Sequence, residues 1–183
     1  LLRDEAHVGV PLASVRGFPA STAHGVLSIY ADASLEGFGA WTCVSEEEIW
    51  CVCGEWTADE LRDRIICDLE LWASNVGLDV FGSAYDAAHF YEFTDNSVAL
   101  MVMRSMNPGS VALQQLMQWR MGMLTGRGWR SAPERISTRN NSWADALSRG
   151  RLEWVRAQVE RLGMRLVWLD ASTSRGVGMS WLQ

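Results

Sequence analysis

The segment that most constrains the fold is 26–44, where two predicted strands flank a short polar turn. Apolar, β-branched and aromatic residues predict a strand that runs from residue 26 into Asp32, and a second strand is predicted over 38–44. A carboxylate at the end of a core strand lies at the edge of a sheet, where a metal or a polar substrate can reach it. Alternatively, Asp32 and Ser34 are turn-forming residues of a hairpin. This segment alone leaves both interpretations open.

The rest of the chain predicts an α/β fold, a mixed sheet with helices packed on it. Residues 1–24 lack periodicity and are expected to be a linker or the tail of a preceding domain. Hydrophobic spacing and breakers such as Asn107-Pro108-Gly109 define the remaining elements. In chain order these are strands over 26–32, 38–44 and 48–56, a helix over 64–81, a strand over 89–94, helices over 96–106 and 110–124, a strand over 135–138, helices over 141–147 and 151–162, and a strand over 164–169.

Charge is distributed unevenly along the 183 residues. Residues 1–103 carry a net charge of −13 and residues 104–183 carry +7, and every positive side chain is an arginine. Because arginine binds phosphate bidentately, the basic half favours a nucleic-acid partner, whereas a coding bias would explain the missing lysine but not the uneven placement. No apolar run is long enough to span a membrane, and four cysteines without a CxxC pair indicate reduced thiols. We therefore expect no membrane association and an intracellular location.

Glu70 is the most informative single residue. It falls on the apolar stripe of the predicted helix 64–81, together with Ile66, Ala73 and Gly77. Burying a carboxylate without a partner costs several kcal/mol, so Glu70 requires a cation. A divalent metal at the sheet edge satisfies this need more readily than the arginines at the start of the helix.

Two further carboxylates have both a functional and a structural interpretation. Asp95 ends an apolar strand as Asp32 does, but Asp95 or Asn96 is also a suitable cap for the next helix. Asp145 follows Ser142 at the spacing of a capping box. Taken together, three or four carboxylates from separate segments suit Mg²⁺, which prefers oxygen ligands. The three histidines lack zinc-like spacing, and no serine or cysteine has a convincing paired base, so metal-assisted phosphoryl chemistry leads among enzyme functions.

The order of these motifs resembles that of ribonuclease H domains. The last motif is similar to the N-x-x-A-D-x-L-S-R ending of ribonuclease H in retrotransposon reverse-transcriptase polyproteins, gypsy-like or DIRS-like. The resemblance covers about residues 25–150 and leaves 151–183 as a C-terminal helix–strand extension. Its motifs are YADASLEGFGAW (30–41), DLELWA (68–73), FTDN (93–96) and NSWADALSRG (141–150).

The resemblance implies a ribonuclease H-like fold with a five-stranded mixed sheet whose strands 1–3 are antiparallel. It also implies cleavage of the RNA strand of an RNA/DNA hybrid with two Mg²⁺ or Mn²⁺ ions, and an upstream reverse-transcriptase polymerase domain as partner. Asp32 would bridge both ions, Asp95 would lie on the nucleophile side, and Glu70 and Asp145 on the leaving-group side.

The resemblance also suggests substrate contacts. Ser34 and Asn96 are expected near the 2′-hydroxyls of the hybrid, which distinguish RNA from DNA. Many members of the family carry a histidine before the last aspartate, and residues 125–141 contain none. The other residues expected to bind the substrate are Asn141, Arg120, Arg127, Arg130, Arg135 and Arg139.

Two other functions remain open at this stage. One is a non-catalytic nucleic-acid-binding or scaffolding domain that keeps the fold for its shape. The other is a different nuclease or an integrase of the same fold. A proofreading exonuclease is disfavoured because Asp32 is followed by Ala33-Ser34, which lacks the D-x-E motif.

Overall fold

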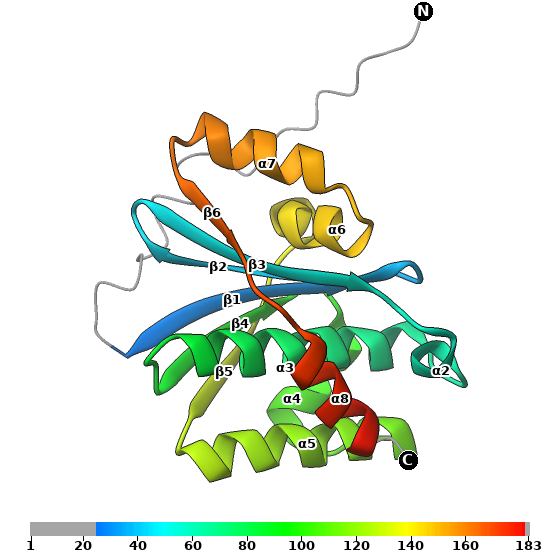
Figure 1. Ribbon diagram of the computed structural model, residues 1–183. Coiled ribbons are helices and arrows are strands. Elements are labelled where there is room, and N and C mark those ends of the chain that lie inside the picture. The colour runs from blue at the N-terminus through cyan, green and yellow to red at the C-terminus, as the bar shows by residue number, and fades with distance from the viewer. Residues whose placement is uncertain (1–24, 182–183) are drawn as a thin grey trace, which may run out of the picture.

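The computed structural model describes residues 25–181, so the expected linker over 1–24 lies outside the described residues. A six-stranded sheet forms the middle layer, with helices on both faces (Figure 1). The mixed α/β architecture is as predicted. No helix within residues 25–181 has the length and apolar character needed to cross a membrane.

Strand β1 lies at the centre of the sheet, in the order β5-β4-β1-β2-β3-β6. It pairs antiparallel with β2 and parallel with β4, and β2 pairs antiparallel with β3, as expected for strands 1–3. The strands are β1 (Val26–Ala33), β2 (Gly37–Ser45), β3 (Glu48–Glu55), β4 (His89–Thr94), β5 (Arg130–Arg135) and β6 (Arg165–Trp168).

The five-stranded sheet that the resemblance implied was wrong by one strand: the strand expected over 164–169 is present as β6 and joins the sheet by pairing parallel with β3. The fifth strand was also misplaced: it was expected over 135–138 and lies at Arg130–Arg135. Pro133 lies inside this strand and removes a backbone donor. Proline is tolerated at a sheet edge, where one side of the strand needs no partner, and this hid the strand from the sequence pattern.

Helices α3, α4, α5 and α8 cover one face of the sheet, and α6 and α7 cover the other (Figure 1). Two short elements, α2 and η1, and the C-terminal helix α8 were not anticipated. The helical elements are α2 (Ala58–Leu61), α3 (Ile66–Ala84), α4 (Ser97–Ser105), α5 (Val111–Arg127), η1 (Thr138–Asn141), α6 (Ser142–Ser148), α7 (Leu152–Arg161) and α8 (Ser172–Trp181).

Two glycines allow helices to approach the sheet closely on opposite faces. A Cβ on Gly77 of α3 would lie 3.0 Å from Cβ of Ala40 and 3.2 Å from Cγ2 of Ile29. A Cβ on Gly39 of β2 would lie 2.3 Å from Cβ of Leu147, so α6 reaches the sheet only because this position has no side chain. The two contacts bring α3 and α6 to either side of the end of β1.

Candidate active site

Asp32 lies near the C-terminal end of β1 and is 6% exposed. The turn that follows is formed by Ser34, whose Oγ accepts hydrogen bonds from the backbone N–H groups of Glu36 at 3.0 Å and Gly37 at 3.2 Å. The Asp32 carboxylate instead accepts a hydrogen bond from Ser148 Oγ at 2.7 Å. The turn interpretation therefore holds for Ser34, while Asp32 faces a pocket.

Glu70 projects from α3 toward the same pocket and is also 6% exposed. Its Oε2 atom is buried and has no hydrogen-bond partner among the described residues. The buried arginine that might have paired with it, Arg120, contacts Glu92 instead. A buried carboxylate oxygen without a protein donor is the feature expected of a metal ligand.

Asp95 directly follows β4, which runs parallel to β1, so the ends of these neighbouring strands bring Asp95 close to Asp32. The helix that follows is capped by Asn96, whose Oδ1 accepts from the backbone N–H groups of Val98 and Ala99, each at 3.0 Å. Since Asn96 provides this cap, the Asp95 carboxylate is left for the pocket.

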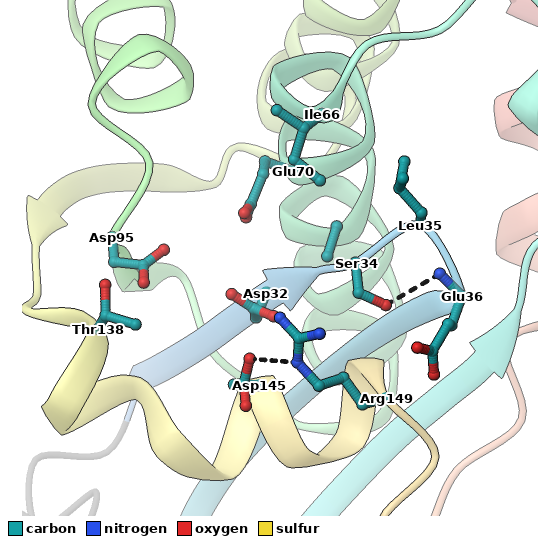
Figure 2. Close-up of a pocket in the computed structure, with 11 residues that line it drawn as sticks. Asp32, Ser34, Leu35, Glu36, Ile66, Glu70, Asp95, Thr138, Asp145 and Arg149 are labelled. Atoms are coloured by element: carbon teal, nitrogen blue, oxygen red, sulfur yellow. Dashed lines mark hydrogen bonds and ion pairs between the residues drawn. The ribbon is translucent and has the colours of Figure 1, made fainter.

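Ligand atoms of Asp32, Glu70 and Asp95 all lie within 4.8 Å of one another. Figure 2 shows the three carboxylates converging from β1, α3 and the end of β4. Carboxylate oxygens at this separation, two of them on buried residues, fit a hard divalent cation such as Mg²⁺ or Mn²⁺. The three residues thus form a group able to hold a metal ion.

Asp145 lines the same pocket from α6 but lies outside this group of three. Its Oδ1 accepts a hydrogen bond from Arg149 Nε at 2.7 Å, one helical turn later. The capping box considered for this segment is not formed, because Asn141 is the N-cap residue and Ser142 Oγ has no partner among the described residues.

The pocket has a volume of about 460 Å³ and opens at the C-terminal end of β1 (Figure 2). Acidic side chains gather on its floor and Arg149 lies at one side. Its lining consists of Asp32, Ala33, Ser34, Leu35, Glu36, Ile66, Glu70, Asp95, Thr138, Asp145 and Arg149.

Burial and mutual repulsion disfavour ionisation of the two innermost carboxyl groups. Burial, with smaller contributions from Asp95 and Asp145, raises the pKa of Asp32 to about 7, although the hydrogen bond from Ser148 opposes this rise. Burial, followed by the charges of Asp32 and Asp95, raises the pKa of Glu70 to about 9. A bound cation would reverse this preference, since it stabilises the charged forms.

The residues expected to bind substrate have different environments. Ser34 lines the pocket, and Arg130 and Arg139 are exposed. Asn141 is 1% exposed, and its Nδ2 donates to the backbone oxygen of Ala31 at 3.0 Å, which ties the start of α6 to β1 beside Asp32. This hydrogen bond makes Asn141 a positioning residue for the pocket.

The expectation that Arg120 binds a nucleic-acid backbone was wrong. Arg120 is 1% exposed and forms a buried ion pair with Glu92 of β4, supported by hydrogen bonds to Asn75 and Ser131. The sequence held a signal for this pair. Glu92 lies two residues after buried Phe90 and so on the same face of β4, which places its carboxylate in the core, where it needs a cation. The other two expected arginines, Arg127 and Arg135, are exposed.

Ser148 and Arg149 are further neighbours of the acidic group, and neither was predicted from the sequence. Ser148 Oγ donates to Asp32 across 116 residues of chain, and only the packing of α6 on the sheet brings them together. Arg149 follows on the same helix end. Both residues stand in the NSWADALSRG segment, which was the available signal.

Comparison with solved structures supports the fold. The structure is similar to RNase H1 from the halophilic archaeon Halobacterium salinarum, with a TM-score of 0.53, 16% sequence identity, and 70% of this chain and 98% of that chain covered. The N-terminal RNase H domain of a Mycobacterium tuberculosis protein gives a TM-score of 0.49 at 15% identity, covering 73% and 98% of the two chains. LC9-RNase H1, described as a type 1 enzyme with a type 2 active-site motif, gives 0.46 at 16% identity, covering 81% and 90%.

No protein-family model and no curated protein sequence matches the chain. The chain has the ribonuclease H-like fold, as its strand order and its likeness to the archaeal structure show. The acidic group at the end of the central strand is the candidate active site of this fold.

Proposed function

We propose that this domain is a metal-dependent endoribonuclease that cleaves the RNA strand of RNA/DNA hybrids. The observation that carries the proposal is the convergence of Asp32, Glu70 and Asp95 within 4.8 Å, with a buried Glu70 oxygen that accepts no hydrogen bond from any described residue. The ribonuclease H-like fold supports the same chemistry. Two bound Mg²⁺ or Mn²⁺ ions would supply an activated water and charge stabilisation for the leaving oxygen.

The chain's own residues would hold these ions in one place. Asp32 lies between the other carboxylates in Figure 2, which supports its expected role as the ligand common to both ions. Asp95 then belongs to the nucleophile side, and Glu70 and Asp145 to the leaving-group side. Ser148 keeps the Asp32 carboxylate in place through its hydrogen bond.

Binding of the hybrid is proposed to use residues around the pocket. Ser34 lies on its wall, and Asn96, which caps α4, stands next to Asp95. Exposed Arg130 and Arg139 are the proposed contacts with the backbone of the hybrid. Arginine at such positions would give an affinity that falls with salt concentration.

The NSWADALSRG segment supports a place in reverse transcription, with a reverse-transcriptase polymerase domain upstream in the same polyprotein and an intracellular site of action. We propose residues 25–150 as the ribonuclease H-like domain and 151–183 as an extension. Within that extension, β6 adds an edge strand to the sheet beside β3, and an ion pair between Arg175 and Glu60 joins α8 to α2.

The test is a cleavage assay with strand-labelled RNA/DNA hybrid, DNA duplex and single-stranded RNA, with Mg²⁺, with Mn²⁺ and with chelator. We expect metal-dependent cleavage of the RNA strand of the hybrid, and its loss in Asp95→Asn. Asp86→Asn is the matched control, because Asp86 is exposed and lies outside the pocket. Absence of metal-dependent cleavage would favour a non-catalytic binding domain, and cleavage of DNA duplex would favour another nuclease or an integrase.

A further inference from the structure

Within residues 25–181, Arg149 is the one cationic side chain that lines the acidic pocket. It follows the last turn of α6, and its side chain is 42% exposed. Figure 2 shows its guanidinium extending over the pocket between Asp145 and Glu36, beside Asp32. The positive charge of Arg149 only slightly offsets the rise that burial causes in the pKa of Asp32.

The guanidinium is anchored through one atom and open at the other two. Nε donates to Asp145 Oδ1 at 2.7 Å, whereas Nη1 and Nη2 make no hydrogen bond with any residue that the structure describes. An arginine held by Nε presents its terminal N–H groups as a planar fork, the geometry that binds two oxygens of one phosphate. Pairing with Asp145 also restricts the side chain before a ligand arrives, which reduces the entropy lost on binding.

Arg149 also stands where the acidic pocket meets a second hollow. This hollow has a volume of about 220 Å³ and shares Glu36 and Arg149 with the first. Part of its wall consists of Gly37, Gly54 and Gly150, and among the described residues Arg149 is again the one cation in its lining. A chain molecule that crosses from the acidic pocket into this hollow therefore passes the open side of the guanidinium.

We propose that Arg149 binds a phosphate of the substrate strand next to the scissile one, at the junction of the two hollows. This inference rests on the proposed function, since it requires a phosphodiester chain in the acidic pocket. Asp145 then orients the guanidinium for the phosphate through Oδ1. Arg149 thereby places the strand relative to the carboxylates, and it offsets their repulsion of the phosphates.

The alternative is that Arg149 and Asp145 are only an ion pair one turn apart on the end of a helix. Such a pair stabilises a helix slightly and has no effect on a ligand. Arg156 and Glu153 on α7 provide the matched control, because they form an exposed pair of this kind outside both hollows.

The experiment measures the dissociation constant of an RNA/DNA hybrid in the presence of chelator, where no strand is cut, over a range of salt concentrations. We expect Arg149→Gln to weaken binding about 3- to 10-fold at low salt and to reduce the slope of log K against log salt by about 1, as loss of one phosphate contact requires. Arg149→Lys should keep the slope but lose part of the affinity. Arg156→Gln should behave as the parent.

Equal affinity and equal salt slope for Arg149→Gln and Arg156→Gln would overturn the inference, as would a parent protein that binds neither hybrid nor DNA duplex. Thermal unfolding of each variant in chelator shows that a loss of binding does not come from a loss of fold. The proposed function is tested by a different experiment, the cleavage assay, and it fails if the parent shows no metal-dependent cleavage. If the parent cuts DNA instead, the same comparison is made on DNA duplex.

Discussion

Replacing Glu70 by glutamine is expected to stabilise the metal-free protein at neutral pH. Glu70 is 6% exposed, and burial beside other carboxylates raises its pKa from 4.5 to about 9. Between these values the folded state keeps a proton that the unfolded chain releases. The folded protein therefore loses stability as the pH rises through this window, and the loss is complete above the folded pKa.

The size of the effect follows from the window. A pH of about 7.5 lies roughly three units above the pKa of a glutamate in the unfolded chain and below the pKa of Glu70 in the folded protein. Deprotonation of the unfolded chain therefore lowers the free energy of unfolding by about 4 kcal/mol. Glutamine has no ionisation to oppose folding, so Glu70→Gln should raise the free energy of unfolding by up to about 4 kcal/mol at pH ~7.5 and by little at pH ~4.5. For a domain of this size that is a rise in Tm of roughly 10 °C.

The assay is chemical or thermal unfolding in chelator at pH values from ~4.5 to ~8, with Glu36→Gln as control, because Glu36 is exposed on the rim of the same pocket. Adding Mg²⁺ or Mn²⁺ should then stabilise the parent more than the variant, since the parent alone keeps all its ligands. A variant that is no more stable than the parent at pH ~7.5, or a gain that does not depend on pH, would show that Glu70 does not keep its proton in the folded protein.

Three further outcomes are expected. Gly39→Ala should lower the free energy of unfolding by about 1–3 kcal/mol and reduce cleavage, because the added Cβ would collide with Leu147 of α6. Denaturant unfolding and the cleavage assay measure the two effects. Ser148→Ala removes a hydrogen bond that lowers the pKa of Asp32, so the variant should bind metal only at a higher pH than the parent does. Calorimetric titration with Mg²⁺ or Mn²⁺ over a range of pH measures this, and an unchanged pH profile would contradict the role of that hydrogen bond. Arg120→Met leaves Glu92 buried without its cation and should lower the free energy of unfolding by about 3–5 kcal/mol, as denaturant unfolding measures. The folded variant should bind the hybrid as the parent does.

The carboxylates could be found from sequence because each violates or ends a hydrophobic pattern. Asp32 and Asp95 terminate apolar strands, and Glu70 interrupts an apolar stripe, so local spacing already points them toward one sheet edge. Their separation could not be predicted in this way. The distances between the carboxylates depend on how closely α3 and α6 approach the sheet, and Gly77 and Gly39 allow that approach between distant parts of the chain.

Other features were hidden because they depend on contacts rather than on local pattern. The strand over 164–169 was predicted and is present as β6, but its place in the sheet, paired with β3, could not be read from its own residues. Helix α8 contains Gly176 and Gly178, which disfavour a helix, so the sequence pattern did not predict it. Its packing against α3 and α5 stabilises it. Arg120 was misassigned because nothing in its own helix shows that Glu92 lies opposite it.

The metal site formed by the three carboxylates is tested most directly by anomalous diffraction from a crystal containing Mn²⁺ at a concentration that supports cleavage. Anomalous peaks are expected within coordination distance of Asp32, with Glu70 and Asp95 among the other ligands. Peaks located elsewhere, or no peak at these carboxylates in protein that still cleaves the hybrid, would contradict it.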